Sequence, residues 1–491
     1  MSFSPKLIAL ILLAFCWRPA RASNQDCRIP AKDNTNVITS RTGDVLAHVV
    51  PIDWSRFTPY GKIEPRSSEL TECATIFLNT VSYNLSWATD AIEKQDGKAP
   101  FTGLEGLEKR GAHDFIRPVC NVAFGLAVAL KTGVYEEEVS GVPKAEVRAR
   151  ALQLIHGAAR NHRGQGWGYP WQSALWAAYL GHGAWMLWDD LDVETRALVA
   201  ELVEWEADRL ADVTVPYWDG RGGDTKAEEN GWNSMVLSLA VAMMPNSPRV
   251  PAWKEKCSEF MISAYSTEDD LHNGRVIDGK PVKDWLRGFN ANADGSVVNH
   301  GFVHPDYMLG VHSNLRAFAV KPLAGQVVPE AADFNADRVY RCLVTREWPS
   351  PPYAAPGGTI YRPGEPFMYY PQRADWSRVN CISSYLVDVH AWTLGLDKDL
   401  PHSAKHWMQV RAAKIREMQQ RHTDRRIWAD GEFDTWPGRE QTACGRLGAA
   451  FLMLWIHAQD GTVKRANWLS RQDESYSAFI GQTSHSPSGS M

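Results

Sequence analysis

The sequence predicts an all-α protein, built as an (α/α)n toroid with little sheet. Three observations lead to this fold class. Helical periodicity recurs along the chain, whereas alternating polar and apolar runs that indicate strands are few. Several helical segments are apolar on every side, as helices buried all round are. Others are amphipathic, and long polar loops join the two kinds. Buried inner helices that alternate with amphipathic outer ones are what a toroid requires.

The amphipathic segments are the expected outer helices. Residues 144–162 carry one apolar face at helical spacing, and residues 191–213 carry another, with Asp192 as the expected N-cap. Residues 403–420 have the same character. The apolar face of the first segment consists of Val147, Ala151, Leu154, Ile155 and Ala158, and that of the second includes Leu198, Leu202 and Trp205.

The inner helices are expected where apolar residues leave no polar face. The clearest such segment is "WQSALWAAYLGHGAWMLW" at 171–188. Residues 231–244, 383–396 and 445–458 have the same composition. A helix of this kind is stable only when neighbours cover it on all sides. These four segments are therefore predicted to form the interior of the fold.

The start of the chain has the pattern of a secretory signal peptide. Lys6 precedes the apolar run "LIALILLAF", and "ARA" at 20–22 fits a small-residue cleavage site. We expect a signal peptide over 1–22, an extension over 23–44, one catalytic domain over 45–475 and a disordered tail over 476–491. The apolar run is short for a membrane span. The mature protein is therefore expected to be secreted or periplasmic, with no membrane association after cleavage.

Charge and cysteine content narrow the possible functions. The net charge is -5, which does not suggest the basic face of a nucleic-acid binder. Seven cysteines follow the signal, so at least one is unpaired, and no CxxC pair indicates a structural zinc site. Export would permit one or two disulfides. These cysteines are Cys27, Cys73, Cys120, Cys257, Cys342, Cys381 and Cys444.

Five polar loops combine Trp or Tyr with Gly, Arg and carboxylates. The chain has 21 Trp in all, and aromatic faces with polar edges suit sugar rings. Most Trp are expected in the core, but those in the Gly-rich loops are predicted to bind sugar. The loops span 161–172, 216–233, 292–310, 355–376 and 425–440. The predicted sugar-binding Trp are Trp167, Trp171, Trp218, Trp376 and Trp436.

Two of these loops resemble a known enzyme group. "DGSVVNH" at 294–300, followed by Tyr307, is similar to the Asp-Gly-Ser…His…Tyr segment of the hyaluronate, chondroitin and xanthan lyases. "ENGW" at 229–232 resembles the segment that carries their catalytic asparagine, with Gly231 in place of the first Trp. The chain lacks room for the β-sandwich domains that usually follow, as do smaller toroid lyases such as alginate lyases. The resemblance is therefore to the polysaccharide lyases with α/α-toroid catalytic domains.

The chemistry of β-elimination on a uronic acid assigns roles to these residues. The substrate carboxylate must be neutralised, a base must remove the C5 proton, and an acid must protonate the leaving O4. Asn230 and Asn233 are candidates for the first task, and His300 for the base. Tyr307 suits the acid, or the base if an arginine lowers its pKa. The predicted substrate-binding residues besides the Trp are Asn299, Arg287, Arg362, Arg373 and Arg439, the arginines as bidentate carboxylate ligands.

Two other classes of function stay open. An inverting glycoside hydrolase on an α/α toroid needs two carboxyl groups roughly 6.5–9.5 Å apart. A secreted sugar-binding protein would use the Trp loops without proton transfer. No cofactor and no metal are expected, because Gly301 and Pro305 interrupt the helix that a His300–His304 pair would need. Calcium on the loop carboxylates Asp219, Asp224 and Glu228 is the likeliest exception. The carboxyl groups considered for hydrolysis are Asp224, Glu228 or Glu229 with Asp294, Glu432 or Asp434.

Overall fold

The computed structural model describes residues 40–93, 112–163, 166–168, 172–374, 381–432, 438–459 and 463–469. About 60% of the structure is helical, so the predicted all-α class is confirmed. Residues Ile38–Met491 form one compact unit, to which all described residues belong. A separate unit, Met1–Val37, lies outside the described residues, as do the predicted signal peptide and tail.

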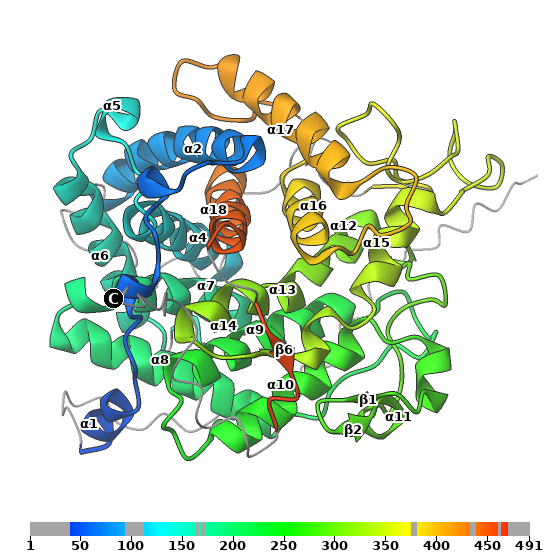
Figure 1. The fold of residues 1–491 in the computed structure, drawn as a ribbon, viewed down its shortest axis with the longest axis horizontal. Helices are drawn as coiled ribbons and strands as arrows, with labels where there is room; N and C mark the ends of the chain where they lie inside the picture. Colours follow the sequence, from blue (N-terminus) through cyan, green and yellow to red (C-terminus); the bar gives the residue numbers. More distant parts are fainter. Residues whose placement is uncertain are drawn as a thin grey trace, which may run out of the picture. The chain divides into compact units, whose positions relative to one another are not determined.

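Helices account for nearly all regular structure in the described ranges (Figure 1). The longer ones are α1 (Ser40–Ala47), α2 (Ser68–Glu93), α4 (Ala112–Lys131), α6 (Lys144–Arg160), α7 (Ser173–Met186), α8 (Val193–Ala211), α9 (Ala227–Met243), α10 (Val250–Ala264), α14 (Ala317–Ala324), α15 (Ala336–Thr345), α16 (Ile382–Leu394), α17 (Ala404–Gln420) and α18 (Arg439–His457). Single-turn helices are α5 (Glu137–Ser140), α11 (Val282–Trp285), α12 (Pro305–Met308) and α13 (His312–Leu315). The 3-10 helices are η1 (Trp54–Arg56), η2 (Tyr60–Lys62), η3 (Trp188–Asp190), η4 (Glu268–His272), η5 (Leu309–Val311) and η6 (Glu330–Asp333).

The described strands are two residues long and form three separate pairs. Strands β1 (Val276–Ile277) and β2 (Lys280–Pro281) are antiparallel, as are β3 (Val298–Asn299) and β4 (Phe302–Val303). Strands β5 (Val328–Pro329) and β6 (Arg465–Ala466) are parallel and join distant parts of the chain. The little sheet that the sequence led us to expect is therefore what the structure has.

The helices follow the sequence signals closely. The Asp192 side chain accepts a hydrogen bond from the Thr195 N–H at 2.7 Å, which confirms the predicted N-cap of α8. The five residues predicted to form the apolar face of α6 are all buried. In α7, every residue except Leu175 is buried, as expected for a helix without a polar face. Amphipathic spacing thus marks the outer helices and uniform apolarity the inner ones.

Six helical segments contact one another in an order that returns to its start. Helix α4 packs against α7, α7 against α9, α9 against α13 and α14, α13 against α16, α16 against α18, and α18 against α4. The amphipathic helices α6, α8, α10, α17 and α2 pack against members of this set, α6 for example against α4 and α7. Figure 1 shows α18 beside α4 and α16.

Glycines allow the closest of these approaches. A Cβ atom on Gly183 of α7 would lie 2.9 Å from the Phe124 Cα of α4. A Cβ atom on Gly445 of α18 would lie 2.0 Å from the Asn121 Oδ1, also on α4. Any side chain at either position would force the helices apart, so both neighbours of α4 depend on a glycine.

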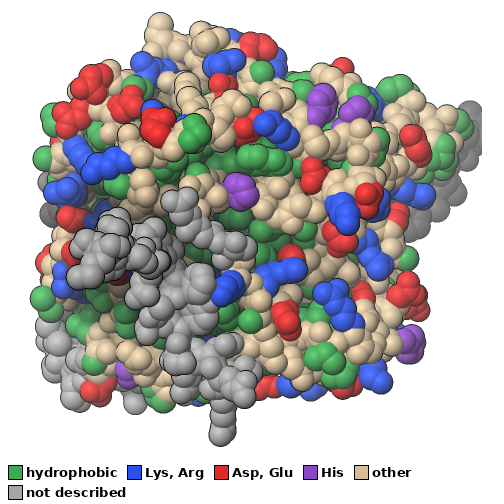
Figure 2. All heavy atoms as spheres, viewed as in Figure 1, with side chains coloured by type: hydrophobic (Ala, Val, Ile, Leu, Met, Phe, Trp, Pro, Cys, Tyr) green, Lys and Arg blue, Asp and Glu red, His purple; other side chains and the backbone are tan. Residues whose placement is uncertain are grey.

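The described cysteines, helices and surface charges can be compared with the predictions made from the sequence. All six described cysteines are buried and free, so none of them forms the disulfide that export would permit. No described helix is both long and apolar enough to span a membrane. On the face in Figure 2, outside the grey atoms, basic and acidic side chains are interspersed. That face carries no single-sign patch of the kind that nucleic-acid binding requires.

Candidate active site

The loop at 292–310 folds into a tight hairpin followed by one helical turn. Strands β3 and β4 pair Val298 with Val303 and Asn299 with Phe302, which leaves His300 and Gly301 as the two turn residues. Both have positive φ, 51° and 82°, as a two-residue hairpin turn requires. Histidine rarely adopts this conformation. The turn presents His300 to solvent at the tip of the hairpin.

The hairpin brings His300 next to Tyr307. The His300 Nε2 lies 3.2 Å from the Tyr307 hydroxyl, within hydrogen-bond distance. Tyr307 lies on α12, and its ring also meets that of the buried His304 edge-on, with centroids 4.7 Å apart. The two residues that the sequence predicts to handle protons are therefore in direct contact.

The preceding polar loop holds the hairpin in place. The Asp224 Oδ1 accepts from the His300 backbone N–H at 2.5 Å, and the Gly223 carbonyl accepts from the Gly301 N–H at 2.8 Å. The Thr225 N–H donates to the Val298 carbonyl at 2.8 Å. The predicted loops 216–233 and 292–310 thus form one structural unit, and the Asp224 carboxylate fixes the backbone of His300.

Glu228 stands beside this unit at the start of α9. A Cβ atom on Gly310 would lie 3.6 Å from the Glu228 side chain and 2.8 Å from the Tyr265 hydroxyl. That hydroxyl donates to the Tyr307 carbonyl at 3.2 Å. Glu228 therefore lies close to the segment that carries Tyr307.

The environment of Glu228 raises the pKa of its carboxyl group to about neutral pH. Burial of the carboxyl group raises its pKa to about 7, and the nearby charges of Glu229 and Asp306 add to this effect. Arg117 and Arg446 act in the opposite direction, but burial outweighs them. The carboxyl group itself is buried, although Glu228 as a whole residue retains some solvent exposure.

The charged groups around Glu228 lie in the N-terminal halves of their helices. Arg117 lies early in α4, Glu228 is the second residue of α9, and Arg446 lies two turns into α18. Arg446 donates to the Ser383 hydroxyl, on the second residue of α16. Arg117 donates to the Gln172 side chain at the N-cap of α7. The positive ends of these helix dipoles gather here and favour bound negative charge.

The two predicted catalytic asparagines do not face this cluster. The fully buried Asn230 donates through Nδ2 to the Pro216 carbonyl and to the Ser263 hydroxyl of α10, both at 3.0 Å. Asn233 lies roughly 60° from Asn230 around α9 and roughly 140° from Glu228. Its Oδ1 is enclosed without a hydrogen-bond partner among the described residues. The Nδ2 group of Asn230 is thus engaged by α10 and by Pro216, whereas its buried Oδ1 has no hydrogen-bond partner among the described residues. These contacts indicate a structural role for Asn230 rather than the predicted catalytic one.

The predicted sugar-binding Trp divide into three groups. Trp167 is only 1% exposed and donates to the Ala158 carbonyl at 2.7 Å, so it is a core residue and its predicted role is wrong. Trp218 is half-buried, donates through Nε1 to the Gly222 carbonyl and meets Phe289 edge-on. Trp171, Trp376 and Trp436 lie outside the described residues.

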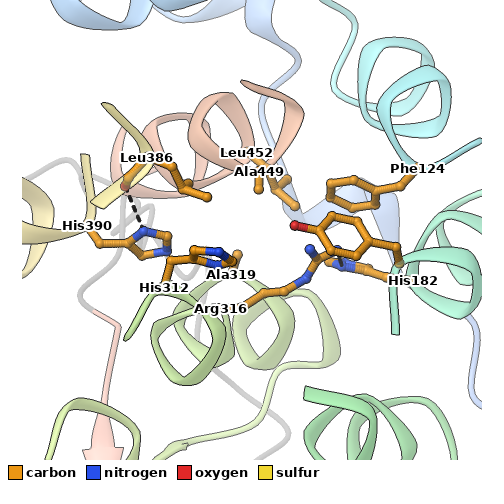
Figure 3. Close-up of a pocket in the computed structure, with 10 residues that line it drawn as sticks. Phe124, His182, His312, Arg316, Ala319, Leu386, His390, Ala449 and Leu452 are labelled. Atoms are coloured by element: carbon orange, nitrogen blue, oxygen red, sulfur yellow. Dashed lines mark hydrogen bonds between the residues drawn. The ribbon is translucent and has the colours of Figure 1, made fainter. Parts of the chain in front are cut away.

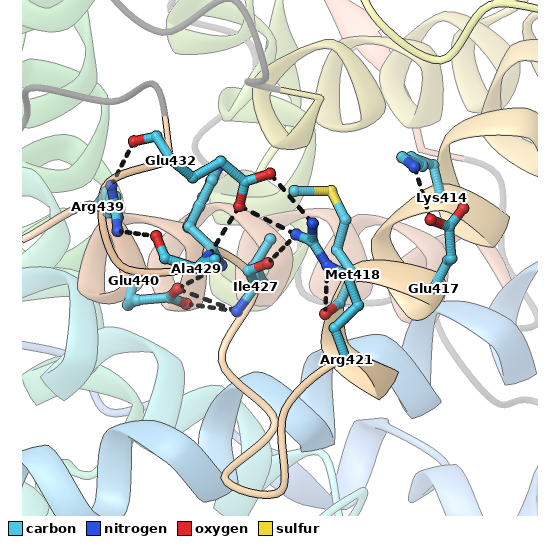
Figure 4. Close-up of polar contacts among 10 residues, drawn as sticks. Lys414, Glu417, Met418, Arg421, Ile427, Ala429, Glu432, Arg439 and Glu440 are labelled. Carbon is cyan, nitrogen blue, oxygen red and sulfur yellow. Dashed lines mark hydrogen bonds and ion pairs between the residues drawn. The ribbon is translucent and has the colours of Figure 1, made fainter.

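The predicted substrate arginines mostly support their own loops. Arg439 donates to the carbonyls of Ala429 and Glu432, inside a loop that Glu440 also anchors (Figure 4). Arg362 donates to the Gly357 carbonyl and covers the Tyr369 ring. Arg287 is exposed, and its contacts with other described residues do not indicate a role.

Arg373 is the arginine closest to the hairpin. It is exposed, and its guanidinium lies 4.7 Å from the centroid of Phe302 on β4. The neighbouring Gln372 side chain accepts from the Val303 N–H at 2.5 Å. Asn299 of β3 is buried beneath the hairpin turn, with only 7% of its surface exposed. Arg373 is therefore the predicted arginine best placed to meet a ligand at the tip.

Arg117 and Arg446 were missed because each lies within a largely apolar helix. In such a segment a single arginine is easily interpreted as an exposed residue, and no local motif marks it. Among the described residues, no group of three or more His, Cys, Asp or Glu could hold a metal ion. Comparisons with protein-family models, curated proteins and solved structures find no match to the chain.

Proposed function

We propose that the protein is a secreted or periplasmic polysaccharide lyase that cleaves a uronic-acid-containing polysaccharide by β-elimination. The observation that carries this proposal is the contact between His300 and Tyr307, at 3.2 Å. Glu228, on whose carboxyl group the charges of Arg117 and Arg446 act, lies close to the segment that carries Tyr307. A proton-transfer pair next to cations at helix N-termini suits an acidic sugar. His300 acts as the base toward C5, and Tyr307 protonates the leaving O4.

An (α/α)6 toroid is the architecture we propose for the described helices. The contacts that run from α4 through α7, α9, α13–α14, α16 and α18 and back to α4 support an inner ring. Helices α6, α8, α10, α15, α17 and α2 supply one outer partner for each inner segment. In this arrangement the inner helices begin at the same end, which is where Glu228 and the arginines lie.

Neutralisation of the substrate carboxylate falls to the arginines rather than to Asn230. Their guanidinium groups can bind a carboxylate through two parallel hydrogen bonds. Neutral Glu228 at this position adds no repelling charge below pH 7, the approximate pKa of its carboxyl group. The substrate anion would therefore meet cations and an uncharged acid, which lowers the cost of forming a carbanion at C5.

A panel of uronic-acid polymers tests the proposal directly. β-Elimination creates a conjugated double bond that absorbs ultraviolet light, whereas hydrolysis yields reducing ends alone. The expected result is ultraviolet absorbance that rises in step with reducing ends on at least one polymer. Reducing ends without ultraviolet absorbance would show that the protein is a hydrolase and not a lyase. Measurable binding of a polymer, with no product from any polymer, would favour a sugar-binding protein.

Inverting hydrolysis is the second candidate, and one observation favours it. Glu228 has its pKa raised to about 7 by burial, and the charge of Asp306 acts on it. A general acid with such a pKa next to a second carboxyl group is the arrangement that hydrolases use. In that case Glu228→Gln would abolish turnover, while Tyr307→Phe would have little effect.

A further inference from the structure

A cavity lies deeper in the protein, among the middle turns of the helices whose first turns form the candidate site. Phe124 follows Arg117 by seven residues on α4, which places it about 10 Å further along that helix. The cavity is small and partly open, with a volume of about 10 Å³, which is room for about one water-sized occupant. Its lining comprises Phe124, Tyr179, His182, His312, Arg316, Ala319, Leu386, His390, Ala449 and Leu452.

The lining includes a buried arginine that has no acidic partner. Arg316 is 5% exposed, and its guanidinium lies 4.2 Å from the Phe124 ring centroid and 4.0 Å from that of Tyr179. Among the described residues, no Asp or Glu forms an ion pair with it. Its Nη1 is enclosed and has no hydrogen-bond partner there. A buried charge without a partner is costly, so this group favours an anion beside it.

Histidine His182 supplies a second unused donor. Its Nδ1 lies 3.1 Å from the Arg316 Nη2, and because an arginine can only donate, this nitrogen accepts. The neutral imidazole then carries its proton on Nε2, which is buried and lacks a partner among the described residues. Figure 3 shows Arg316 and His182 on one side of the cavity, with His312 and His390 on the other.

Among the described residues, the charges that act most strongly on these histidines are positive. Burial lowers the pKa of His182 and of His312 well below the ordinary value, and that of His390 to about 4. The charged groups that add to this effect are Arg316 and, for His312, Arg446. The described groups around the cavity thus combine neutral histidines with positive charge, and Arg446 links the cavity to the candidate site above.

We propose that this cavity binds a small monovalent anion, of halide or carboxylate size, between the Arg316 Nη1 and the His182 Nε2–H. The anion supplies a negative charge beside the Arg316 guanidinium. It also supplies a hydrogen-bond acceptor for the Arg316 Nη1–H and the His182 Nε2–H, which have none among the described residues. It comes either from solution as an inorganic ion or from the acid group of a sugar. The site follows from burial and unused donors, and it does not depend on which reaction takes place above it.

Bromide is the probe, because its anomalous scattering identifies it in crystals of the full chain. We expect an anomalous peak in the cavity, in contact with Arg316 and His182. We also expect bromide to raise the melting temperature at constant ionic strength, relative to a bulky sulfonate that the cavity excludes. Glucuronate that displaces bromide, where glucose does not, would assign the site to a sugar acid. Bromide that glucuronate cannot displace would assign it to an inorganic anion. A cavity without bromide, together with no anion-dependent stabilisation, would overturn the proposal.

Two variants separate this site from a general effect of anions. Arg316→Met removes the charge and keeps an apolar stem against Phe124, and it should weaken bromide binding at least tenfold. Lys321→Met is the matched control, since Lys321 is a fully buried basic residue that hydrogen-bonds Ser238 and Gln326 and does not line the cavity. It should bind bromide like the unmodified protein. Equal loss in both variants would contradict the assignment, and the crystallographic result stands even if Arg316→Met fails to fold.

Discussion

The His300–Tyr307 hairpin and the Arg316 cavity use the same kinds of side chain in opposite surroundings. His300 is exposed at a hairpin tip with φ 51°, whereas His182 is fully buried in the middle of α7. At the tip, a histidine can exchange protons with solvent and substrate. In the cavity, burial lowers the histidine pKa values, so these rings stay neutral and serve as hydrogen-bond groups. Residue type alone therefore does not separate a histidine that is open to proton exchange from one that burial keeps neutral.

Removing the proton-transfer pair should have the largest effect. His300→Ala and Tyr307→Phe should each lower kcat by roughly 10²–10⁴, the usual range for loss of a general acid or base. The measurement is kcat on the polymer that proves to be the substrate. His272→Ala, at another exposed histidine, and Tyr353→Phe are the controls and should change kcat less than twofold. Near-normal turnover in both site variants would remove the hairpin from the mechanism.

Trp167→Ala should make the protein easier to unfold without changing how it binds substrate. The loss should be about 3–5 kcal/mol in the free energy of unfolding, the range for a large buried aromatic residue. Urea denaturation measures this loss. KM, measured at urea concentrations below the unfolding transition of the variant, should stay the same. Trp218→Ala, at a half-buried Trp, is the comparison and should cost less stability. A higher KM with unchanged stability in Trp167→Ala would restore its predicted role in sugar binding.

Asn230→Ala tests whether the asparagine that the resemblance singled out is structural. The change removes the Asn230 donor from the Ser263 hydroxyl and from the Pro216 carbonyl, which keeps only the longer bond from Asn290 at 3.4 Å. This loss should cost about 1–3 kcal/mol of stability. Turnover should stay within about twofold, since the amide points away from Glu228. A loss of kcat on the order of 10² with unchanged stability would instead return Asn230 to the catalytic group.

The smallest predicted effect is a pH dependence of substrate binding through Glu228. Its carboxyl group is uncharged below about pH 7 and becomes negative above it. Above that pH it repels an acidic substrate, so KM should rise by about fivefold, the factor for roughly 1 kcal/mol between like charges in water. Glu228→Gln should remove the rise, which KM measurements from pH 6 to pH 8 would detect. A rise in KM that persists in Glu228→Gln would show that a group other than Glu228 causes it.

Much of the fold could be predicted from sequence because local patterns decide it. The Asp192 cap, the apolar face of α6 and the uniform apolarity of α7 each have a physical signature within one segment. Trp167 shows where this reasoning fails. Its Gly-rich surroundings indicate a loop, and the structure shows an irregular segment, but that segment folds back so that the indole reaches the Ala158 carbonyl. Burial of a loop residue depends on tertiary contacts that no short pattern records.

The candidate site, like the fold, has one part with a local sequence signal and another part without such a signal. The hairpin could be predicted because Gly, Asn, His and Tyr gather within one loop. Arg117, Arg446 and Arg316 come from separate helices, and only packing brings the first two around Glu228 and the third into the cavity. Single arginines within apolar segments carry no periodic signal. Sequence reasoning therefore proposed the residues that lie within one loop, and it did not propose those that only tertiary structure brings together.

Simultaneous ultraviolet and reducing-end assays on a panel of uronic-acid polymers test the central claim most directly. The account predicts that both signals rise together on at least one polymer, one double bond for each new reducing end, and that both nearly vanish in Tyr307→Phe. Reducing ends without ultraviolet absorbance, with full activity in Tyr307→Phe and none in Glu228→Gln, would contradict it.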